Sequence, residues 1–219
     1  YGSSHELVLK QNFRLHLLNG KEDQEISLKH KDWLGFSQLQ DVSESSIFID
    51  MYPGSHVIVD HYGLDCQWES NINCESMTVI DDLADRHHKC SLLIDQSLKN
   101  TKLNYENLVD GNFDFMGGNL VILREEFSDE RAWKALGSGK VLICMGGADP
   151  KSYTKKILEN IILNHKRCSS PQDEIEINVI VGSACTDYDD LKSLAVTDKL
   201  KVSILFNPEN ISQLMLQSE

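Results

Sequence analysis

Short apolar runs rich in β-branched residues recur along this chain, and polar or turn residues follow each of them. The runs cover residues 56–60, 77–80, 91–95, 140–144, 175–181 and 202–205. Such runs are typical of strands buried in a parallel sheet. Stretches with helical spacing lie between several runs; within residues 152–165, for example, Ile157, Leu158, Ile161 and Ile162 share one helix face. This alternation predicts an α/β fold with open, mostly parallel sheets.

The chain is expected to form two domains, residues 1–127 and 128–219, because residues 128–139 are polar and end in glycine. In the first domain we also expect the end of a helix over 6–10 that runs into a strand over 13–18, a loop over 21–32 and a helix over 33–51 whose Leu39, Val42 and Ile47 face inward. A helix is expected over 68–75, a connecting region over 105–118 and the start of a strand or helix over 120–127. The second domain has the order strand, turn, helix, strand, helix, strand, helix, which is the first half of a doubly wound sheet.

Charge and cysteine usage exclude several classes of protein. The net charge of −13 argues against binding to nucleic acid or to an anionic membrane, since both need a basic face. No apolar run reaches the roughly 18 residues of a transmembrane helix. The 6 cysteines form no C-x-x-C pair, which argues against a zinc site or a disulfide framework and favours a cytoplasmic location. Cys144 lies in an apolar run and is expected to be buried.

The clearest candidate ligand site is the strand–turn–helix junction over residues 141–152. Gly146 and Gly147 have no Cβ, so their N–H groups can approach a phosphate closely. The helix that follows presents unpaired N–H groups and a positive dipole end. No Gly-Lys-Ser/Thr sequence follows, so this is not a P-loop. The alternative is a tight turn without a ligand.

A second candidate site follows the first-domain strand over 56–60. Asp60, His61 and Tyr62 place a carboxylate, an imidazole and a phenol at the strand's carboxyl end, a set that could perform acid–base chemistry. The alternative is that Asp60 caps the next helix while the two rings pack against the wall of a crevice.

Two further segments hold polar groups. Residues 81–88 (DDLADRHH) contain three carboxylates and two histidines, which are residue types that can bind a metal ion. The favoured alternative is that the three carboxylates cap a helix and pair with Arg86. The adjacent histidines are expected to point apart. Residues 205–211 (LFNPENI) could present backbone groups to a flat base, or form an ordinary loop in which Asn207 and Asn210 cap.

Several segments together resemble the UDP-2,4-diacetamido-2,4,6-trideoxy-β-L-altropyranose hydrolases, which are nucleotide-sugar hydrolases of pseudaminic acid biosynthesis. The resemblance runs from about residue 33 to residue 215, through WLGFSQLQD (33–41), VIVDHYGLD (57–65), VIDDLADRHH (79–88), LLIDQSL (92–98), LREEF (123–127) and ICMGGADP (143–150). It implies two open-sheet domains of the two-domain glycosyltransferase type, with a UDP-sugar between them. It also implies that water cleaves the anomeric C–O bond and releases UDP, with no metal or other cofactor.

The resemblance also implies roles for individual residues. Tyr62, His61 and Asp60 would lie on the sugar side. The diphosphate and nucleotide would meet residues of the second domain, namely Gly146, Gly147, Asp149, Phe206, Asn210 and Ile211. Arg124 and Glu126 would lie at the crossing between the domains.

Two features of the family are not found in this chain. Members open with a strand and a G-x-G-H-x-x-x-R loop whose histidine is the expected general base; here only Gly2-Ser3-Ser4-His5 resembles it, which makes His5 the candidate. A small-residue loop followed by Trp-Glu, which grips the nucleotide-sugar, is also not found. Both domains are therefore expected to be incomplete, and the chain is expected to be feebly active unless His5 substitutes.

The favoured function is hydrolysis of a UDP-linked deoxyamino sugar. The alternatives are a noncatalytic nucleotide-sugar binding module, a glycosyltransferase-like protein and a structural domain without a ligand. The stereochemistry of the sugar and the oligomeric state stay open at this point.

Overall fold

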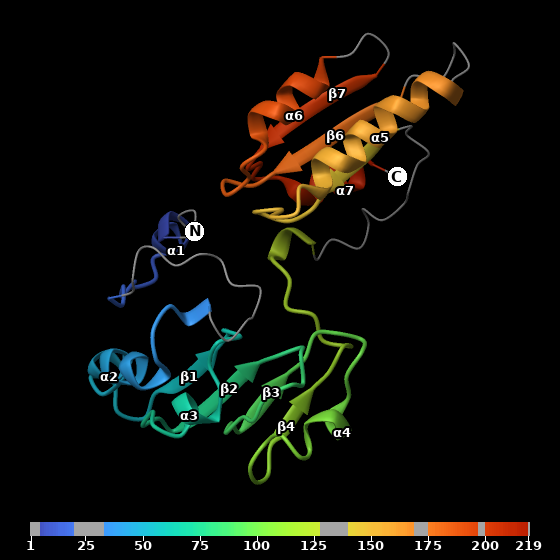
Figure 1. The fold of residues 1–219 in the computed structure, drawn as a ribbon. Helices are drawn as coiled ribbons and strands as arrows, with labels where there is room; N and C mark the ends of the chain where they lie inside the picture. Colours follow the sequence, from blue (N-terminus) through green and yellow to red (C-terminus); the bar gives the residue numbers. More distant parts are fainter. Residues whose placement is uncertain (1–4, 20–32, 128–139, 169–174, 197–199, 219) are drawn as a thin grey trace. The chain divides into compact units, whose positions relative to one another are not determined.

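The computed structural model describes residues 5–19, 33–127, 140–168, 175–196 and 200–218. The chain divides into two compact units, one formed by Arg14–Ile122 and one by Tyr1–Phe13 with Leu123–Glu219. Each unit contains an open parallel sheet and helices (Figure 1), which confirms the predicted α/β class. The loop expected over 21–32 and the boundary segment over 128–139 lie outside the described residues.

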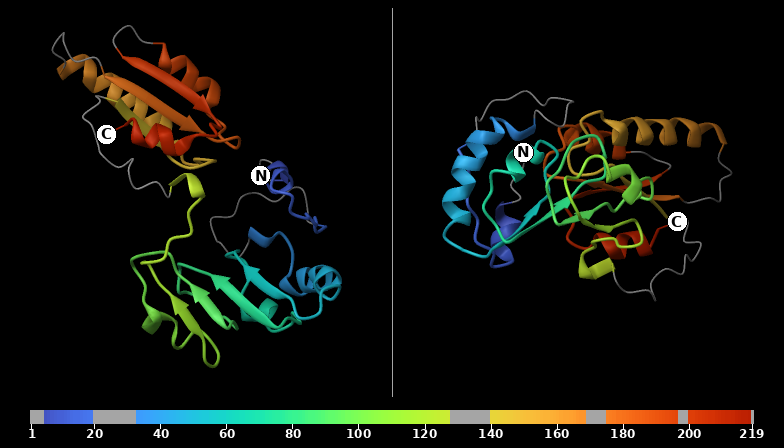
Figure 2. Two further views of the ribbon diagram at one scale, coloured as in Figure 1. Left: turned by 180° about the vertical axis from the view of Figure 1, so that it is seen from behind. Right: turned by 90° about the horizontal axis from the view of Figure 1, so that it is seen from below.

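The sheet of Arg14–Ile122 has four parallel strands in chain order: β1 (His56–Val59), β2 (Ser76–Ile80), β3 (Leu92–Ile94) and β4 (Asp114–Met116). Helix α2 (Gln38–Ile49) lies beyond β1 and helix α4 (Lys102–Tyr105) beyond β4, as the front view (Figure 1) and the view from behind (Figure 2) both show. Helix α3 (Cys66–Glu69) lies on the connection from β1 to β2. Because the strands are parallel, the residues that follow β1, β2 and β3 emerge at one edge of this sheet.

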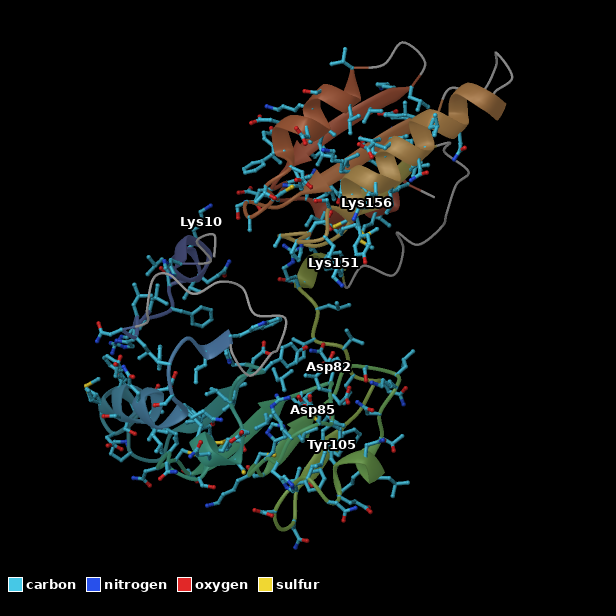
Figure 3. The ribbon with its side chains drawn as sticks, in the orientation of Figure 1. Lys10, Asp82, Asp85, Tyr105, Lys151 and Lys156 are labelled. Atoms are coloured by element: carbon cyan, nitrogen blue, oxygen red, sulfur yellow. The ribbon has the colours of Figure 1, made fainter. Side chains whose placement is uncertain are left out.

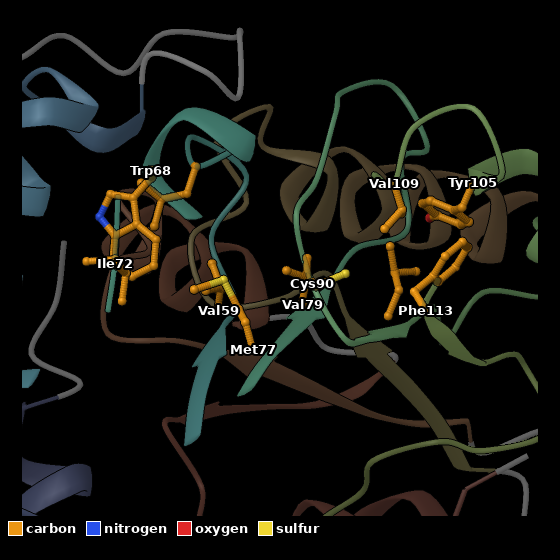
Figure 4. Packing of buried hydrophobic residues seen from close by; sticks show 11 residues of the cluster. Val59, Trp68, Ile72, Met77, Val79, Cys90, Tyr105, Val109 and Phe113 are labelled. Atoms are coloured by element: carbon orange, nitrogen blue, oxygen red, sulfur yellow. The ribbon is translucent and has the colours of Figure 1, made fainter. Parts of the chain in front are cut away.

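The core of this unit lies around the two central strands (Figure 4). Val79 on β2, Leu93 on β3 and the Tyr105 ring are almost fully buried, and Trp68 and Phe113 pack in the same cluster. Strand β1 is at the edge of the sheet, and the Ile58 side chain is 69% exposed. The expectation that β1 is a buried strand is therefore correct only for the face that carries Val59.

The sheet of the second unit has three parallel strands, β5 (Lys140–Cys144), β6 (Glu176–Val181) and β7 (Lys201–Phe206), again in chain order. Helices α5 (Tyr153–Cys168), α6 (Tyr188–Ala195) and α7 (Ile211–Leu216) follow the strands in turn. Leu158 and Leu191 from the first two helices are fully buried against Ile177 and Val179 of the central strand. The expected order of strands and helices is confirmed in this part of the chain.

Near the amino terminus the expected strand is wrong, whereas the expected helices are confirmed with different bounds. Residues 13–18 form no strand, because alternation alone does not make one without a partner strand; Phe13 and Leu17 are exposed, and the neighbouring regular element is helix α1 (His5–Lys10). The helix expected over 33–51 begins only at Gln38, where the Ser37 side chain caps it. Leu39 and Ile47 are exposed, while Val42 packs on the core as expected.

Other differences concern short or terminal segments. The region expected to be a plain connection over 105–118 contains β4, whose three residues are too few to show a pattern. The helix expected over 68–75 is the single turn α3, and the segment over 120–127 contains only a 3₁₀ turn, Glu125–Phe127. Cys144 is exposed rather than buried, because it is the last residue of β5 and enters the exposed turn.

No helix in the part of the chain that the structure describes is both long enough and apolar enough to cross a membrane.

Candidate functional site

Two loops at the carboxyl edge of the first sheet are joined by a phenol–carboxylate pair. The Tyr62 hydroxyl, from the loop after β1, donates a 2.7 Å hydrogen bond to Oδ1 of Asp82, from the loop after β2. This hydrogen bond and the nearby carboxylates raise the pKa of Tyr62 to about 12, so the phenol keeps its proton at neutral pH. The sequence predicts Asp82 only as a metal ligand, a helix cap or a partner of Arg86, and not as the acceptor of Tyr62. The sequence signal for this contact is that Asp82 follows the strand next to the one that Tyr62 follows, so both residues emerge at the same edge of the sheet.

The imidazole of His61 has a defined tautomer. The Gly63 backbone N–H donates to His61 Nδ1 at 3.0 Å, so this nitrogen carries a lone pair and the proton of the neutral ring is on Nε2. Burial lowers the pKa of His61, more strongly than the Asp41 and Asp60 carboxylates raise it. At neutral pH His61 is therefore a neutral group that can donate through Nε2.

A buried polar cluster lies where β2 and β3 end; Figure 3 labels one of its members, Tyr105, together with Asp82. The Tyr105 hydroxyl, in a fully buried side chain, lies 2.8 Å from Asp95 Oδ2 and 3.0 Å from Asp81 Oδ2. Asn100 donates to Asp95 Oδ2 at 2.9 Å and to the Asp82 carbonyl at 3.0 Å. Burial raises the pKa of Asp95, but hydrogen bonds from Ser97, Asn100 and Tyr105 outweigh it, and the pKa is lowered overall.

The segment DDLADRHH is held by ion pairs and turns rather than by a helix. Arg86 Nη1 lies 2.7 Å from Asp81 Oδ1 and 3.1 Å from Asp85 Oδ1, as the favoured alternative proposed. Asp81 Oδ2 accepts from the Ala84 N–H at 2.9 Å, and no helix forms between residues 81 and 91. Asp81 and its neighbours therefore do not cap a helix here.

The two histidines of this segment do point apart. His87 is exposed, whereas His88 is 1% exposed and its Nδ1 lies 2.7 Å from Glu69 Oε1. The other oxygen of Glu69 accepts from the Lys89 N–H. Among the described residues, no group of three or more His, Cys, Asp or Glu side chains could hold a metal ion.

In the second unit, the turn between β5 and α5 is exposed. Gly146 has a φ of +78°, a conformation that favours glycine, and a Cβ at either Gly146 or Gly147 would meet nothing within 4 Å. Gly182, which follows β6, lies directly against this turn: a Cβ there would be 2.4 Å from the Gly147 carbonyl oxygen. The glycine pair therefore presents backbone on an open surface and is backed by a third glycine that sequence reasoning did not single out.

Asp149 caps helix α5 with both carboxylate oxygens. Oδ1 accepts from the Tyr153 N–H at 2.9 Å, and Oδ2 accepts from the Thr154 N–H at 2.7 Å. Burial raises the pKa of Asp149, but these hydrogen bonds and Lys156 outweigh it, so the pKa is lowered. Lys151 and Lys156 lie near this helix start (Figure 3), and Lys156 Nζ donates to the Lys151 carbonyl at 2.7 Å. The prediction that the first N–H groups of α5 are open to a ligand is therefore wrong for Tyr153 and Thr154, whose N–H groups donate to this carboxylate.

The remaining predicted residues lie on exposed or half-exposed positions. The Phe206 ring is 49% exposed and lies 5.0 Å from the Tyr188 ring, centroid to centroid. Asn210 is at the N-cap position of α7 but makes no side-chain cap hydrogen bond, so it does not cap as the alternative proposed; its Nδ2 lies 3.4 Å from Gln213 Oε1. Ile211 begins that helix and is half-buried.

Three further predicted site residues, Arg124, His5 and Asp60, make few contacts within the described residues. Arg124 forms a 2.7 Å ion pair with Glu126, which also accepts from the Ser212 N–H at 3.4 Å. His5 begins α1 and is exposed. Asp60 is exposed and caps nothing, because the N-cap of α3 is Asp65.

An open hollow of about 300 Å³ lies elsewhere in the first unit, near the start of β1. It is lined by Ile49, Asp50, Pro53, Gly54, Asn73, Cys74 and Glu75. None of these is a predicted site residue, and the hollow lies at the amino end of β1, opposite to Tyr62.

Comparison with known proteins places this chain among distant relatives. It is 27% identical over 166 residues to the UDP-2,4-diacetamido-2,4,6-trideoxy-β-L-altropyranose hydrolase of Campylobacter jejuni, covering 74% of this chain and 56% of that protein. It is also 27% identical over 180 residues to an uncharacterized protein of Methanocaldococcus jannaschii, covering 74% of this chain and 35% of that protein. The chain thus spans about half or less of the length of these relatives. No protein-family model matches it.

The relationship to the Campylobacter protein is distant. It agrees with the resemblance in the sequence motifs, and at this identity it supports common descent rather than membership of one enzyme family.

Proposed function

We propose that this chain belongs to a hydrolase that cleaves a UDP-linked deoxyamino sugar and releases UDP, as in pseudaminic acid biosynthesis. The proposal is carried by one observation: the Tyr62–Asp82 pair lies at the carboxyl edge of a parallel sheet, in a chain distantly related to a hydrolase of that kind. Ligands of open α/β sheets bind at this edge, outside the ends of the strands.

The reaction sets the requirements for the site. A water oxygen bonds to the anomeric carbon, the bond from that carbon to the diphosphate oxygen breaks, and UDP leaves with the electron pair. A base takes the proton that the water loses. We assign the sugar side to Tyr62, His61 and Asp60. His61 contributes an Nε2–H donor, since its Nδ1 already accepts from Gly63; the base is assigned to His5.

The diphosphate is assigned to the turn formed by Gly146 and Gly147. Its backbone is exposed, and the room beside Gly147 would let a phosphate oxygen approach the N–H groups. The first-turn N–H groups of α5 are not part of the assignment, because Asp149 occupies two of them. Phe206 offers a half-exposed ring to a flat base, with Asn210 and Ile211 beyond it.

UDP binding tests the nucleotide assignment directly. Calorimetry with UDP is run on the whole chain and on Gly147→Ala, a substitution that meets no atom within 4 Å in the protein. We expect the variant to unfold at the same denaturant concentration as the parent and to bind UDP about tenfold more weakly, which corresponds to about 1.4 kcal/mol. Equal affinity of both proteins would remove the turn from the site, and no UDP binding by the parent would refute the proposal.

A noncatalytic nucleotide-sugar binding module is the second candidate. The His61 geometry favours it, because the imidazole beside Tyr62 has no basic nitrogen open at neutral pH. Release of UDP from a UDP-sugar in water separates the two functions: binding without release supports the module, and release supports the hydrolase. A rate that depends on a sugar acceptor would support a glycosyltransferase.

A further inference from the structure

The Tyr62 hydroxyl donates its proton to a carboxylate. Its proton is directed to Asp82 Oδ1 at 2.7 Å. A phenol oxygen has one proton and two lone pairs, so a hydroxyl that donates to a carboxylate presents its acceptor side to other groups. Hydrogen bonds to an ionised acceptor are stronger than those between neutral groups, so the half-buried phenol of Tyr62 is held with its proton toward Asp82.

Asp82 is itself held by the buried cluster beneath it. Its carbonyl accepts from Asn100 Nδ2, and the same amide group donates to Asp95 Oδ2 in the interior. The preceding residue, Asp81, is fixed by its ion pair with Arg86 and by the Tyr105 hydroxyl.

Arg86 connects the two loops that carry the pair. Its Nε donates to the Leu64 carbonyl at 2.9 Å, in the loop of Tyr62, while its Nη1 pairs with Asp81 in the loop of Asp82. The guanidinium also lies 5.7 Å from the centre of the Tyr62 ring. One side chain, 15% exposed, thus fixes the distance between the loops.

We propose that Asp82 is the positioning residue of Tyr62: it directs the phenol proton away from the ligand, so that Tyr62 recognises a hydrogen-bond donor. The donor would be a sugar hydroxyl, an amide N–H of an acylated amino sugar or a water molecule. The ligand part of this inference rests on the proposed function, whereas the polarity of the pair belongs to the protein alone.

The charged groups around Tyr62 act in the same direction, apart from Arg86. Asp82, Asp81 and Asp60 all favour the protonated phenol, and together with burial they raise its pKa to about 12. The Arg86 guanidinium lies over the Tyr62 ring, and the Trp33 ring lies 5.8 Å from it, centroid to centroid.

The titration of Tyr62 tests the pair without any ligand. The 6 tyrosines are replaced uniformly by 3-fluorotyrosine, whose more acidic phenol titrates at lower pH, and each is followed by its ¹⁹F resonance. Tyr62→Phe assigns the resonance. Asp82→Asn, an exposed position, should then lower the titration midpoint of Tyr62 by about one pH unit or more.

Asp85→Asn is the matched control, because Asp85 is an exposed carboxylate three residues further on in the same loop and is not the acceptor of Tyr62 (Figure 3). It should shift the Tyr62 midpoint much less. An unchanged midpoint in Asp82→Asn, or an equal shift in Asp85→Asn, would overturn the inference whether or not the protein hydrolyses a UDP-sugar.

The role of Tyr62 in ligand recognition is tested by measuring the rate of UDP release by the same variants. Both Tyr62→Phe and Asp82→Asn should lower kcat/KM by about tenfold or more, with Asp85→Asn close to the parent. If the parent releases UDP and Asp82→Asn releases it equally fast, Tyr62 does not depend on Asp82 for its role. Failure of the parent to act on any UDP-sugar refutes the proposed function but leaves the titration result standing.

Discussion

Gly182 lies so close to Gly147 that a Cβ at position 182 would be 2.5 Å from the Gly147 Cα and 2.4 Å from its carbonyl oxygen. The end of β6 therefore supports the exposed turn after β5 by direct backbone contact. Backbone atoms cannot move aside as the end of a flexible side chain can, so even one added methyl group must displace the turn.

Gly182→Ala should destabilise the second unit by about 1–3 kcal/mol, the usual cost of overpacking a close contact. Urea unfolding measures this loss. Gly147→Ala, on the other side of the same contact, adds its Cβ to open space and serves as the control. Equal stability of Gly182→Ala and the parent would show that the two glycines do not touch in solution.

Tyr105→Phe should cost about 1.5–3 kcal/mol at neutral pH, because the hydroxyl proton is within hydrogen-bond distance of two buried carboxylates, and its removal leaves them short of a donor. The loss should depend on pH. The pKa of Asp95 is lowered in the folded protein, so the stability that this carboxylate contributes is present above its unfolded pKa and is lost as the pH falls through the folded value. The gap between parent and variant should therefore shrink below about pH 4 in unfolding experiments; a gap that widens there would contradict this.

The indole of Trp68 is tied to a buried carboxylate on α2. Nε1 donates to Asp41 Oδ1 at 2.7 Å, and both side chains are 5% exposed. Trp68→Phe retains most of the apolar surface but removes the donor, so we expect a loss of about 1–3 kcal/mol in the free energy of unfolding. In Trp68→Phe combined with Asp41→Ala, the acceptor is absent too, and the combined loss should be smaller than the sum of the two single losses. Simple additivity would show that the hydrogen bond contributes nothing.

The Asp149 cap of α5 leads to a prediction about both protein stability and UDP affinity. Asp149→Ala removes an acceptor used by two backbone N–H groups and should destabilise the protein by about 0.5–2 kcal/mol. It also frees those N–H groups and removes a negative charge near the glycine turn. UDP should therefore bind no more weakly to Asp149→Ala than to the parent by calorimetry, and a clear loss of affinity at a temperature where the variant is folded would assign Asp149 to the ligand.

The neutral His61 predicts a loss of stability in mild acid. Its folded pKa is lowered by burial, so below the unfolded value near 6.5 the unfolded chain binds more protons than the folded one, and stability falls as the pH falls. One such group contributes at most about 1.4 kcal/mol per pH unit. His61→Gln should flatten the stability profile between about pH 7 and pH 5, whereas His87→Gln, an exposed histidine of the same unit, should keep the slope of the parent.

Most strands could be predicted because their signal is local. The β-branched run at 77–80 and the run at 175–181 are buried in the centres of their sheets, and any chain that places such runs between helices gains by burying them. β4 gave no such signal: it has three residues, lies at the edge of the sheet and is recognisable only from its pairing with β3. The exposure of Cys144 was also not predictable from its apolar run, because it depends on where the strand ends in the folded protein.

The sequence by itself determined which polar residues follow each strand. Because parallel strands direct their carboxyl ends to one edge of the sheet, these residues lie at that edge. Tertiary structure decided how those groups pair: that Asp82 accepts from Tyr62, that Asp149 is used by a helix cap, and that Gly182 touches Gly147. These contacts depend on distances of a few ångströms between residues far apart in the chain. Local periodicity fixes the direction in which a side chain leaves its strand, but only packing of the whole unit brings a partner within reach of it.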